Sequence, residues 1–292
     1  MIRKAYKNWQ RLTPPARVFH SLGLFLLRRP WGQLCALFFK AFTSIFSHSR
    51  SFKTDSRNII LQTFFTGVEI FPILFVVATL FGTIVIFEVV SMMGRVGFSD
   101  VVGSLIVVII IREMGPILTA FLIAGRSGSS LTTYIGSMVI NSEVDALATM
   151  GVDPIRFLVM PGLIGGCVAT VIMNIFFSTS AIVVGYFITK ILIILSGIDL
   201  NVQLTWSYLS SEILGAVWWS DFVFVILKPI IFGAIITTNA CYQALNIPRD
   251  MRQVPKAVSR SVIKSFLYVV IADVICLLYF LPNYMSNLKT II

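Results

Sequence analysis

Long apolar runs, separated by shorter polar and charged stretches, make up most of the chain. A helix needs about 20 residues to cross the hydrocarbon core of a membrane. Five runs are long enough, and they cover roughly residues 68–90, 101–124, 157–194, 222–244 and 265–285. The pattern therefore predicts an all-α integral membrane protein with about five transmembrane helices. The third run is longer than a bilayer requires, which predicts a tilt, or a bend near Pro161 and Gly162.

The first 60 residues follow a different pattern. Apolar and aromatic residues recur there at helical spacing, but basic residues such as Lys40 interrupt them. Such a basic, amphipathic pattern is typical of helices that lie in the membrane interface. We therefore expect N-terminal interfacial helices over residues 1–60 and a membrane domain over residues 61–292. The alternative is a further short span over residues 31–47.

Composition agrees with a membrane protein. Hydrophobic residues make up 57% of the chain and charged residues 12%, against about 25% charged in soluble domains, and the mean hydropathy is +0.90. The net charge of +10 does not indicate nucleic-acid binding, because the basic residues gather beside apolar runs. Residues 1–60 hold eleven Lys and Arg against the single acid Asp55, and residues 245–264 hold five.

This charge distribution predicts one orientation in the membrane. Loops rich in Lys and Arg stay on the cytoplasmic side, which places the N-terminus and the segments 125–156 and 245–264 inside. Segment 195–221 contains acids but no Lys or Arg, so we expect it outside. An odd number of spans then leaves the C-terminus on the outer, periplasmic side.

The segment between the second and third spans predicts a short, firmly held helix. Ser142 and Asp145 fit a capping box that starts a helix near Glu143. Gly151 is suited to the left-handed position that ends it. Asp153 then caps the third span, with Pro154 at its first helical position.

The same short helix, about residues 143–150, is predicted to carry two faces. Val144, Leu147 and Met150 fall on one side, while Glu143 and Asp145 are expected to project freely. A rigid helix that protrudes from the membrane is suited to docking a soluble partner. Capping alone favours a plain connector that touches nothing.

Arg112 and Glu113 are the most costly residues of the second span. A charge at the centre of a membrane helix costs about 2.5–3.5 kcal/mol on insertion scales, so such residues usually face a partner or a cavity. Adjacent helical residues point about 100° apart, so further partners are expected. Glu88 in the first span and Asp273 in the fifth are the candidates. Glu88 is also a candidate for the substrate path, together with Arg112 and Glu113. The pair is interpreted either as packing or as a polar spot on a transport path.

Small residues predict close approach of helices. Gly125 is expected in a flexible corner after the second span, and the sequence around it lacks the Lys-Ser/Thr ending of a phosphate-binding loop. Gly162 and Gly166 are spaced for close helix packing. The complete set assigned packing or structural roles is Gly125, Gly151, Pro154, Gly162, Gly166 and Asp273. No metal site, catalytic residue or bound cofactor is predicted from the His and Cys spacing.

Four motifs in this region occur in the order and spacing of a known family. They are R-E-x-G-P at 112–116, A-G-R-x-G-S at 124–129, I-G-x-M at 135–138 and M-x-V-D-P-x-R at 150–156. From about Gln62 to Leu281, the chain resembles the MlaE/YrbE permeases of ABC transporters, which move phospholipids. The resemblance implies the MlaE-type permease fold, a homodimer and a bacterial inner membrane. It also implies that Arg112 and Glu113 lie close to the lipid path.

The resemblance implies several partners. A cytoplasmic ABC ATPase would use ATP and Mg²⁺ and dock on the 143–150 helix, through Glu143, Asp145, Leu147, Met150 and Asp153. A periplasmic MCE-domain protein would exchange phospholipid, and a STAS-domain regulator sometimes accompanies the complex. Two rival functions remain open. An ATP-independent lipid transporter or scramblase would not need the docking helix, and a membrane-embedded lipid-modifying enzyme would need a catalytic cluster that the sequence lacks.

Overall fold

A computed structural model describes residues 37–38, 52–96, 102–196, 205–217 and 219–288. The elements from residue 52 onward are all helical, and three of them are π-helical turns. In chain order they are α4 (Phe52–Val68), α5 (Phe71–Val96), α6 (Val102–Ile106), the π turn η3 (Val107–Met114), α7 (Gly115–Ile123), the π turn η4 (Ala124–Gly128), α8 (Ser129–Ile140), α9 (Glu143–Thr149), the π turn η5 (Ile155–Val159), α10 (Met160–Ser196), α11 (Trp206–Ala216), α12 (Trp219–Leu245), the 3₁₀ turn η6 (Met251–Gln253) and α13 (Val254–Leu288).

Five helices are long and apolar enough to cross a membrane, which confirms the predicted all-α multi-pass architecture. They cover Phe71–Met92, Val102–Ile140, Ile155–Leu195, Phe222–Leu245 and Met251–Tyr279. The predicted interfacial helices and the alternative span over 31–47 lie almost entirely outside the described residues.

The second span is longer than predicted, and the predicted corner at Gly125 is wrong. The helix continues through η4 and α8 to Ile140. Ser129 Oγ donates to the carbonyl of Gly125 at 2.6 Å, inside the continuous helix. Helix α8 then buries Leu131 and Ile135 in an apolar cluster with residues of the third and fourth spans, such as Leu163 and Ala240. Burial of this face keeps the segment helical, although Gly125 suggested a flexible corner.

The fifth span also begins earlier than expected, because residues 254–264 belong to α13. This part of the helix is amphipathic, because Arg260 is exposed while Ser261, and Ser265 one turn later, are buried. In the third span, the irregularity expected near Pro161 takes the form of the π turn η5 (Ile155–Val159). Pro161 has no N–H to donate to the carbonyl of Phe157 four residues earlier, which disfavours regular α-helical bonding there.

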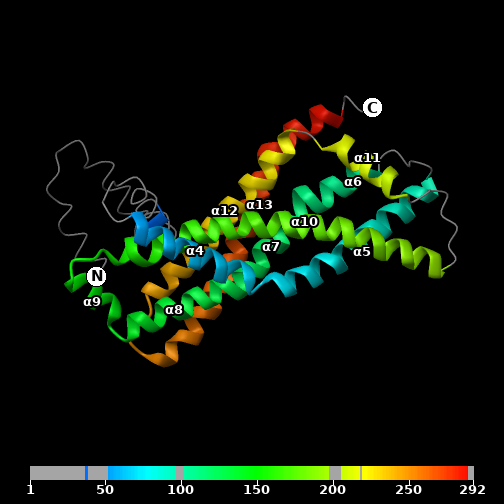
Figure 1. Cartoon of the computed structure of the whole chain (residues 1–292). Coiled ribbons are helices and arrows are strands. Elements are labelled where there is room, and N and C mark those ends of the chain that lie inside the picture. The colour runs from blue at the N-terminus through cyan, green and yellow to red at the C-terminus, as the bar shows by residue number, and fades with distance from the viewer. Residues whose placement is uncertain (1–36, 39–51, 97–101, 197–204, 218, 289–292) are drawn as a thin grey trace, which may run out of the picture.

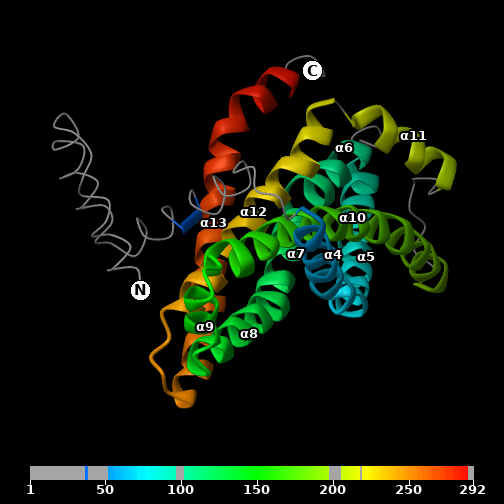
Figure 2. The same cartoon turned by 60° about the vertical axis from the view of Figure 1, so that its left-hand side comes forward.

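Helix α10 runs through the middle of the bundle and packs on α4, α5 and α12 (Figure 1). Helix α9 and the α12–α13 connection lie together at one end, called the α9 end below. Helices α6 and α11 and the C-terminal part of α13 lie at the opposite end (Figure 2).

Glycines allow close approach at two helix crossings. A Cβ on Gly82 of α5 would come within 2.0 Å of the Ala181 carbonyl of α10, and one on Gly166 of α10 within 2.2 Å of Thr237 of α12. Gly166 therefore serves packing within the chain, as a small residue allows. Gly162 is at ordinary contact distance from Leu131.

Candidate functional site

Three charged side chains from three helical segments meet inside the bundle. Lys228 Nζ of α12 lies 2.9 Å from Glu113 Oε2 of η3 and 3.1 Å from Asp273 Oδ1 of α13. The Lys228 side chain is 3% exposed, that of Asp273 10% and that of Glu113 19%. We call Glu113, Lys228 and Asp273 the charged layer. One lysine neutralises part of the charge of two carboxylates, and Arg112 adds a second cation next to Glu113 in the sequence.

Two prolines shape this layer by removing backbone donors. Pro116 cannot donate to the carbonyl of Arg112 four residues earlier, and Lys228 Nζ donates to that carbonyl at 3.1 Å. Pro229 cannot donate to the carbonyl of Val225. Asn174 Nδ2 of α10 donates to that oxygen at 3.2 Å. In each case a polar side chain from another helix satisfies the freed carbonyl, as membrane interiors require.

Helix α10 adds uncharged polar groups beside the charged layer. Asn174 is 0% exposed and Ser178 is 7% exposed. A Cβ on Gly115 would come within 3.0 Å of Ser178 Oγ and 3.3 Å of Asn174 Oδ1, so the glycine admits both side chains. Within the described part of the chain, neither of these two oxygens has a hydrogen-bond partner. The site therefore has spare acceptor and donor capacity around fixed charges.

The structure brings together some of the residues predicted from sequence. Glu113 and Asp273 share Lys228, whereas Glu88 is exposed and is not among the ion-pair partners of Glu113 in the described residues. Sequence reasoning missed Lys228, although it is the single charged residue of its span and precedes a proline. Among the described residues, no three His, Cys, Asp or Glu side chains are grouped to hold a metal. The cluster combines one buried cation with two carboxylates.

The second predicted feature, the short helix at the α9 end, is present as α9 (Glu143–Thr149). Its predicted capping box is wrong. Ser142 has a left-handed backbone (φ 61°) and its side chain makes no capping hydrogen bond. This backbone turns the side chain away from the first N–H groups, and Asn141 Nδ2 donates to Glu143 Oε1 at 3.3 Å instead.

The other end of α9 confirms the prediction. Gly151 has φ +80°, its N–H donates to the carbonyl of Ala148, and that of Val152 donates to the carbonyl of Leu147. These two bonds form a Schellman motif. Asp153 Oδ1 then accepts from the N–H of Ile155 at 3.1 Å, next to Pro154 at the first helical position. The helix is fixed at its C-terminal corner.

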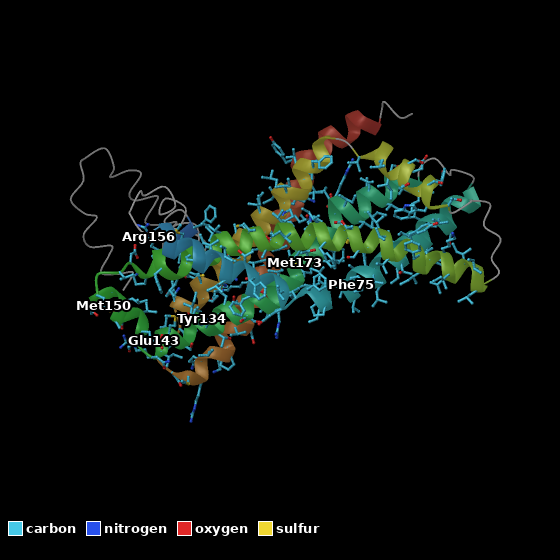
Figure 3. The ribbon with its side chains drawn as sticks, in the orientation of Figure 1. Phe75, Tyr134, Glu143, Met150, Arg156 and Met173 are labelled. Atoms are coloured by element: carbon cyan, nitrogen blue, oxygen red, sulfur yellow. The ribbon has the colours of Figure 1, made fainter. Side chains whose placement is uncertain are left out.

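Helix α9 is anchored on one face and exposed on the other. Val144 is buried, Leu147 is half-buried and Met150 is 68% exposed. Asp145 was expected to project freely, but it forms an ion pair with Arg249 in the α12–α13 connection. The opposite charge of Arg249 holds the acid against the bundle. Figure 3 shows Glu143 and Met150 at the outer limit of the described chain, with Arg156 on the next helix.

Comparisons with known proteins agree with this architecture. The family model described as Permease MlaE matches residues 59–279. The chain is 26% identical over 235 residues to a probable ABC transporter permease protein, ycf63, of Porphyra purpurea, which covers 80% of the chain and 86% of that protein. A probable ABC transporter permease protein of Rickettsia prowazekii is 26% identical over 217 residues, with coverages of 74% and 80%.

A third relative comes from a plant. The chloroplastic protein trigalactosyldiacylglycerol 1 of Arabidopsis thaliana is 24% identical over 237 residues, or 81% of the chain, and the chain spans 65% of that protein's length. Because the family model covers about three quarters of the sequence, the chain belongs to the MlaE family of ABC transporter permeases.

Proposed function

We propose that this permease moves phospholipids between the inner and outer membranes of a bacterium, as a homodimer driven by a separate ABC ATPase. ATP and Mg²⁺ are used by that ATPase and not by this chain. A periplasmic MCE-domain protein exchanges lipid with the permease, and a STAS-domain subunit regulates the complex. The observation that carries the proposal is α9, a short exposed helix fixed at one end of five membrane spans.

Helix α9 has the properties that a coupling element needs. Its buried Val144 and the Asp145–Arg249 pair tie it to α8 and to the α12–α13 connection. A displacement of α9 would therefore also move α8 and the α12–α13 connection, to which it is attached. Met150, exposed at the corner, offers a flexible apolar contact of the kind that protein interfaces favour.

Charge supports an orientation with α9 in the cytoplasm. Arg249, Arg252 and Lys256 lie in or beside the α12–α13 connection at the α9 end. Segment 195–221, at the other side of the third span, contains no Lys or Arg. Under the positive-inside rule, the C-terminus is then on the outer side, which is the periplasm if the membrane is the bacterial inner membrane of the proposal.

Two observations support a diacyl lipid as the substrate. The charged layer lies within spans whose surface is otherwise apolar, so a polar headgroup has a charged partner between the two membrane faces. In addition, one relative carries the name of a diacylglycerol lipid. Arg112 and Glu113 are the residues on this path, and Glu88 stays a candidate nearer the outer end of the first span.

Reconstitution tests the proposal. Proteoliposomes with the permease and its cognate ATPase should transfer labelled phospholipid to an acceptor MCE-domain protein when ATP is added. The permease alone should show no response to ATP. Robust ATP-dependent transfer by the permease alone, or ATP-independent transfer at full rate, would overturn the proposal in favour of a different transporter or a scramblase.

Charge reversal on α9 tests the docking helix. Glu143→Lys should weaken co-purification of the ATPase while insertion and dimerisation stay normal. Arg249→Gln is the matched control, because it breaks the Asp145–Arg249 pair without changing the exposed face of α9. If Glu143→Lys and Met150→Ala leave ATPase binding unchanged, α9 is only a connector.

A further inference from the structure

A cavity at the α9 end is separate from the charged layer. Its volume is about 400 Å³, and it lies between α4, α8 and the start of the third span. One side is apolar and includes Leu61, Phe65 and Phe157. Polar groups line the rest, namely Gln62, Thr66, Glu69, Ser127, Ser130 and Tyr134. In Figure 3, Tyr134 lies between α9, marked by Glu143, and the middle of the bundle, marked by Met173.

An exposed ion pair borders this cavity. Arg126 Nη2 lies 3.3 Å from Glu69 Oε2, and the two side chains are 58% and 44% exposed. We call Glu69 and Arg126 the rim pair. Ser127 Oγ donates to the carbonyl of Thr66 at 3.1 Å, which holds η4 against α4 beside the pair. The cavity lining therefore presents one anion, Glu69, and several hydroxyl groups next to an apolar wall, and Arg126 adds a cation outside the lining through its ion pair with Glu69.

The depth of the rim pair matches lipid headgroups. The second helix continues to Ile140, but its apolar part ends at Ala124, and the next charge after Glu113 is Arg126, thirteen residues later. At about 1.5 Å per residue this is about 20 Å along the helix. Half of a hydrocarbon core is about 15 Å, so Arg126 lies just beyond it when Glu113 is near the middle. Glu69 lies two residues before Phe71, where the first span begins.

We propose that this cavity binds the headgroup and the first acyl carbons of a zwitterionic phospholipid from the leaflet on the α9 side. Arg126 contacts the phosphate, because a guanidinium donates two parallel hydrogen bonds to phosphate oxygens. Glu69 contacts the ammonium group, so the lipid replaces each partner of the rim pair with an equivalent charge. Leu61, Phe65 and Phe157 contact the acyl chains.

This binding does not depend on the proposed transport function, since it needs neither ATP nor an ATPase. The full-length permease in nanodiscs is labelled with a phosphatidylethanolamine that carries a diazirine near the glycerol end of one acyl chain. After ultraviolet irradiation, modified peptides are mapped by mass spectrometry. Adducts are expected on α4 and on residues 155–161, at the apolar wall of the cavity.

Two pairs of matched variants localise the label. Ser130→Trp fills the cavity from an exposed position, whereas Thr133→Trp places the same ring on α8 outside the lining. Arg126→Gln removes the phosphate contact, and Lys256→Gln removes an exposed cation elsewhere at the α9 end. Ser130→Trp should lower cavity labelling by about tenfold, because its ring occupies the cavity. Arg126→Gln should lower it by about two- to fivefold, because water screens an exposed charge contact. The two controls should label like the parent chain.

Competition distinguishes a lipid from a free anion. Unlabelled short-chain phosphatidylethanolamine should suppress the adducts, whereas glycerophosphoethanolamine and inorganic phosphate at equal concentration should not. Adducts that survive Ser130→Trp, or suppression by phosphate alone, would overturn the proposal. Absence of cavity adducts in the parent chain would likewise overturn the proposal. If the parent chain is labelled normally at the cavity but transfers no phospholipid with its ATPase and ATP, the proposed function is wrong and the cavity proposal stands.

Discussion

The bundle contains two buried polar layers of opposite character. The neutral layer consists of Thr132, Asn239, Ser261 and Ser265, all at most 1% exposed. Asn239 Nδ2 donates to the carbonyl of Ser261 and to Ser265 Oγ, both at 2.8 Å, and Thr132 Oγ1 lies 3.1 Å from Ser261 Oγ. The charged layer holds Lys228 between Glu113 and Asp273, with oxygens of Asn174 and Ser178 unsatisfied in the described residues.

The difference between the two layers suggests that they have different roles. The bonds of the neutral layer join α8, α12 and α13, as polar groups between membrane helices commonly do. The charged layer carries a large desolvation cost that apolar residues would avoid. A layer with spare hydrogen-bonding groups and helices loosened by prolines is suited to change its partners. We therefore propose a packing role for the neutral layer and a transport role for the charged layer, and the variants below test this division.

Removal of Lys228, the central cation of the charged layer, should give the largest loss of stability. Lys228→Met leaves two carboxylates without their cation, which typically costs about 3–5 kcal/mol when an ion is buried. We expect a lower Tm and a lower yield of inserted protein. The triple variant Lys228→Met, Glu113→Gln, Asp273→Asn removes the unpaired charge and should recover most of the stability, measured by thermal unfolding in detergent.

Lipid transfer by the triple variant then decides the role of the layer. Transfer should stay low even though the protein is stable, because the charges act on the headgroup. If transfer returns together with stability, the charged layer is a packing device like the neutral one.

The neutral layer should respond in the opposite way. Asn239→Ala removes two donors from a buried network, and loss of such bonds costs about 1–3 kcal/mol. We expect reduced thermal stability but unchanged lipid transfer per inserted molecule. Ser265→Ala, which removes one of the two acceptors, should show a smaller effect of the same kind. A selective loss of transfer at normal stability would contradict the division between the layers.

The carbonyl of Val225, which lacks a backbone donor because of Pro229, allows a test with a smaller expected effect. Asn174→Ala should cost about 1 kcal/mol, since interhelical hydrogen bonds in membranes are weak on average. With Pro229→Ala in the background, the new N–H can reach Val225, so the same change should cost less. A double-mutant cycle on unfolding free energies measures this coupling, and additivity of the two changes would show that Asn174 does not serve the carbonyl.

The spans and part of α9 could be predicted from the sequence, but the contacts between charged side chains inside the bundle could not. Hydropathy was sufficient for five spans, because each apolar run exceeds the membrane thickness. Gly151 could be placed from its own backbone preference. Lys228 was missed because its importance depends on Pro116 and Glu113, which lie on another helix. The corner predicted at Gly125 was wrong because a tertiary contact, the burial of the α8 face, overrides the local preference of glycine.

The smallest effect is expected at the rim pair, which contrasts with the charged layer in exposure. Glu69 and Arg126 are 44% and 58% exposed, and exposed ion pairs contribute about 0–1 kcal/mol because water and salt screen them. Glu69→Gln should therefore shift the Tm little, and less still at high salt. Thermal unfolding at two salt concentrations, beside Lys228→Met as the buried reference, measures the difference. A loss as large as that of Lys228→Met would show that the rim pair is a structural contact, and its exchange with a lipid headgroup would then be ruled out.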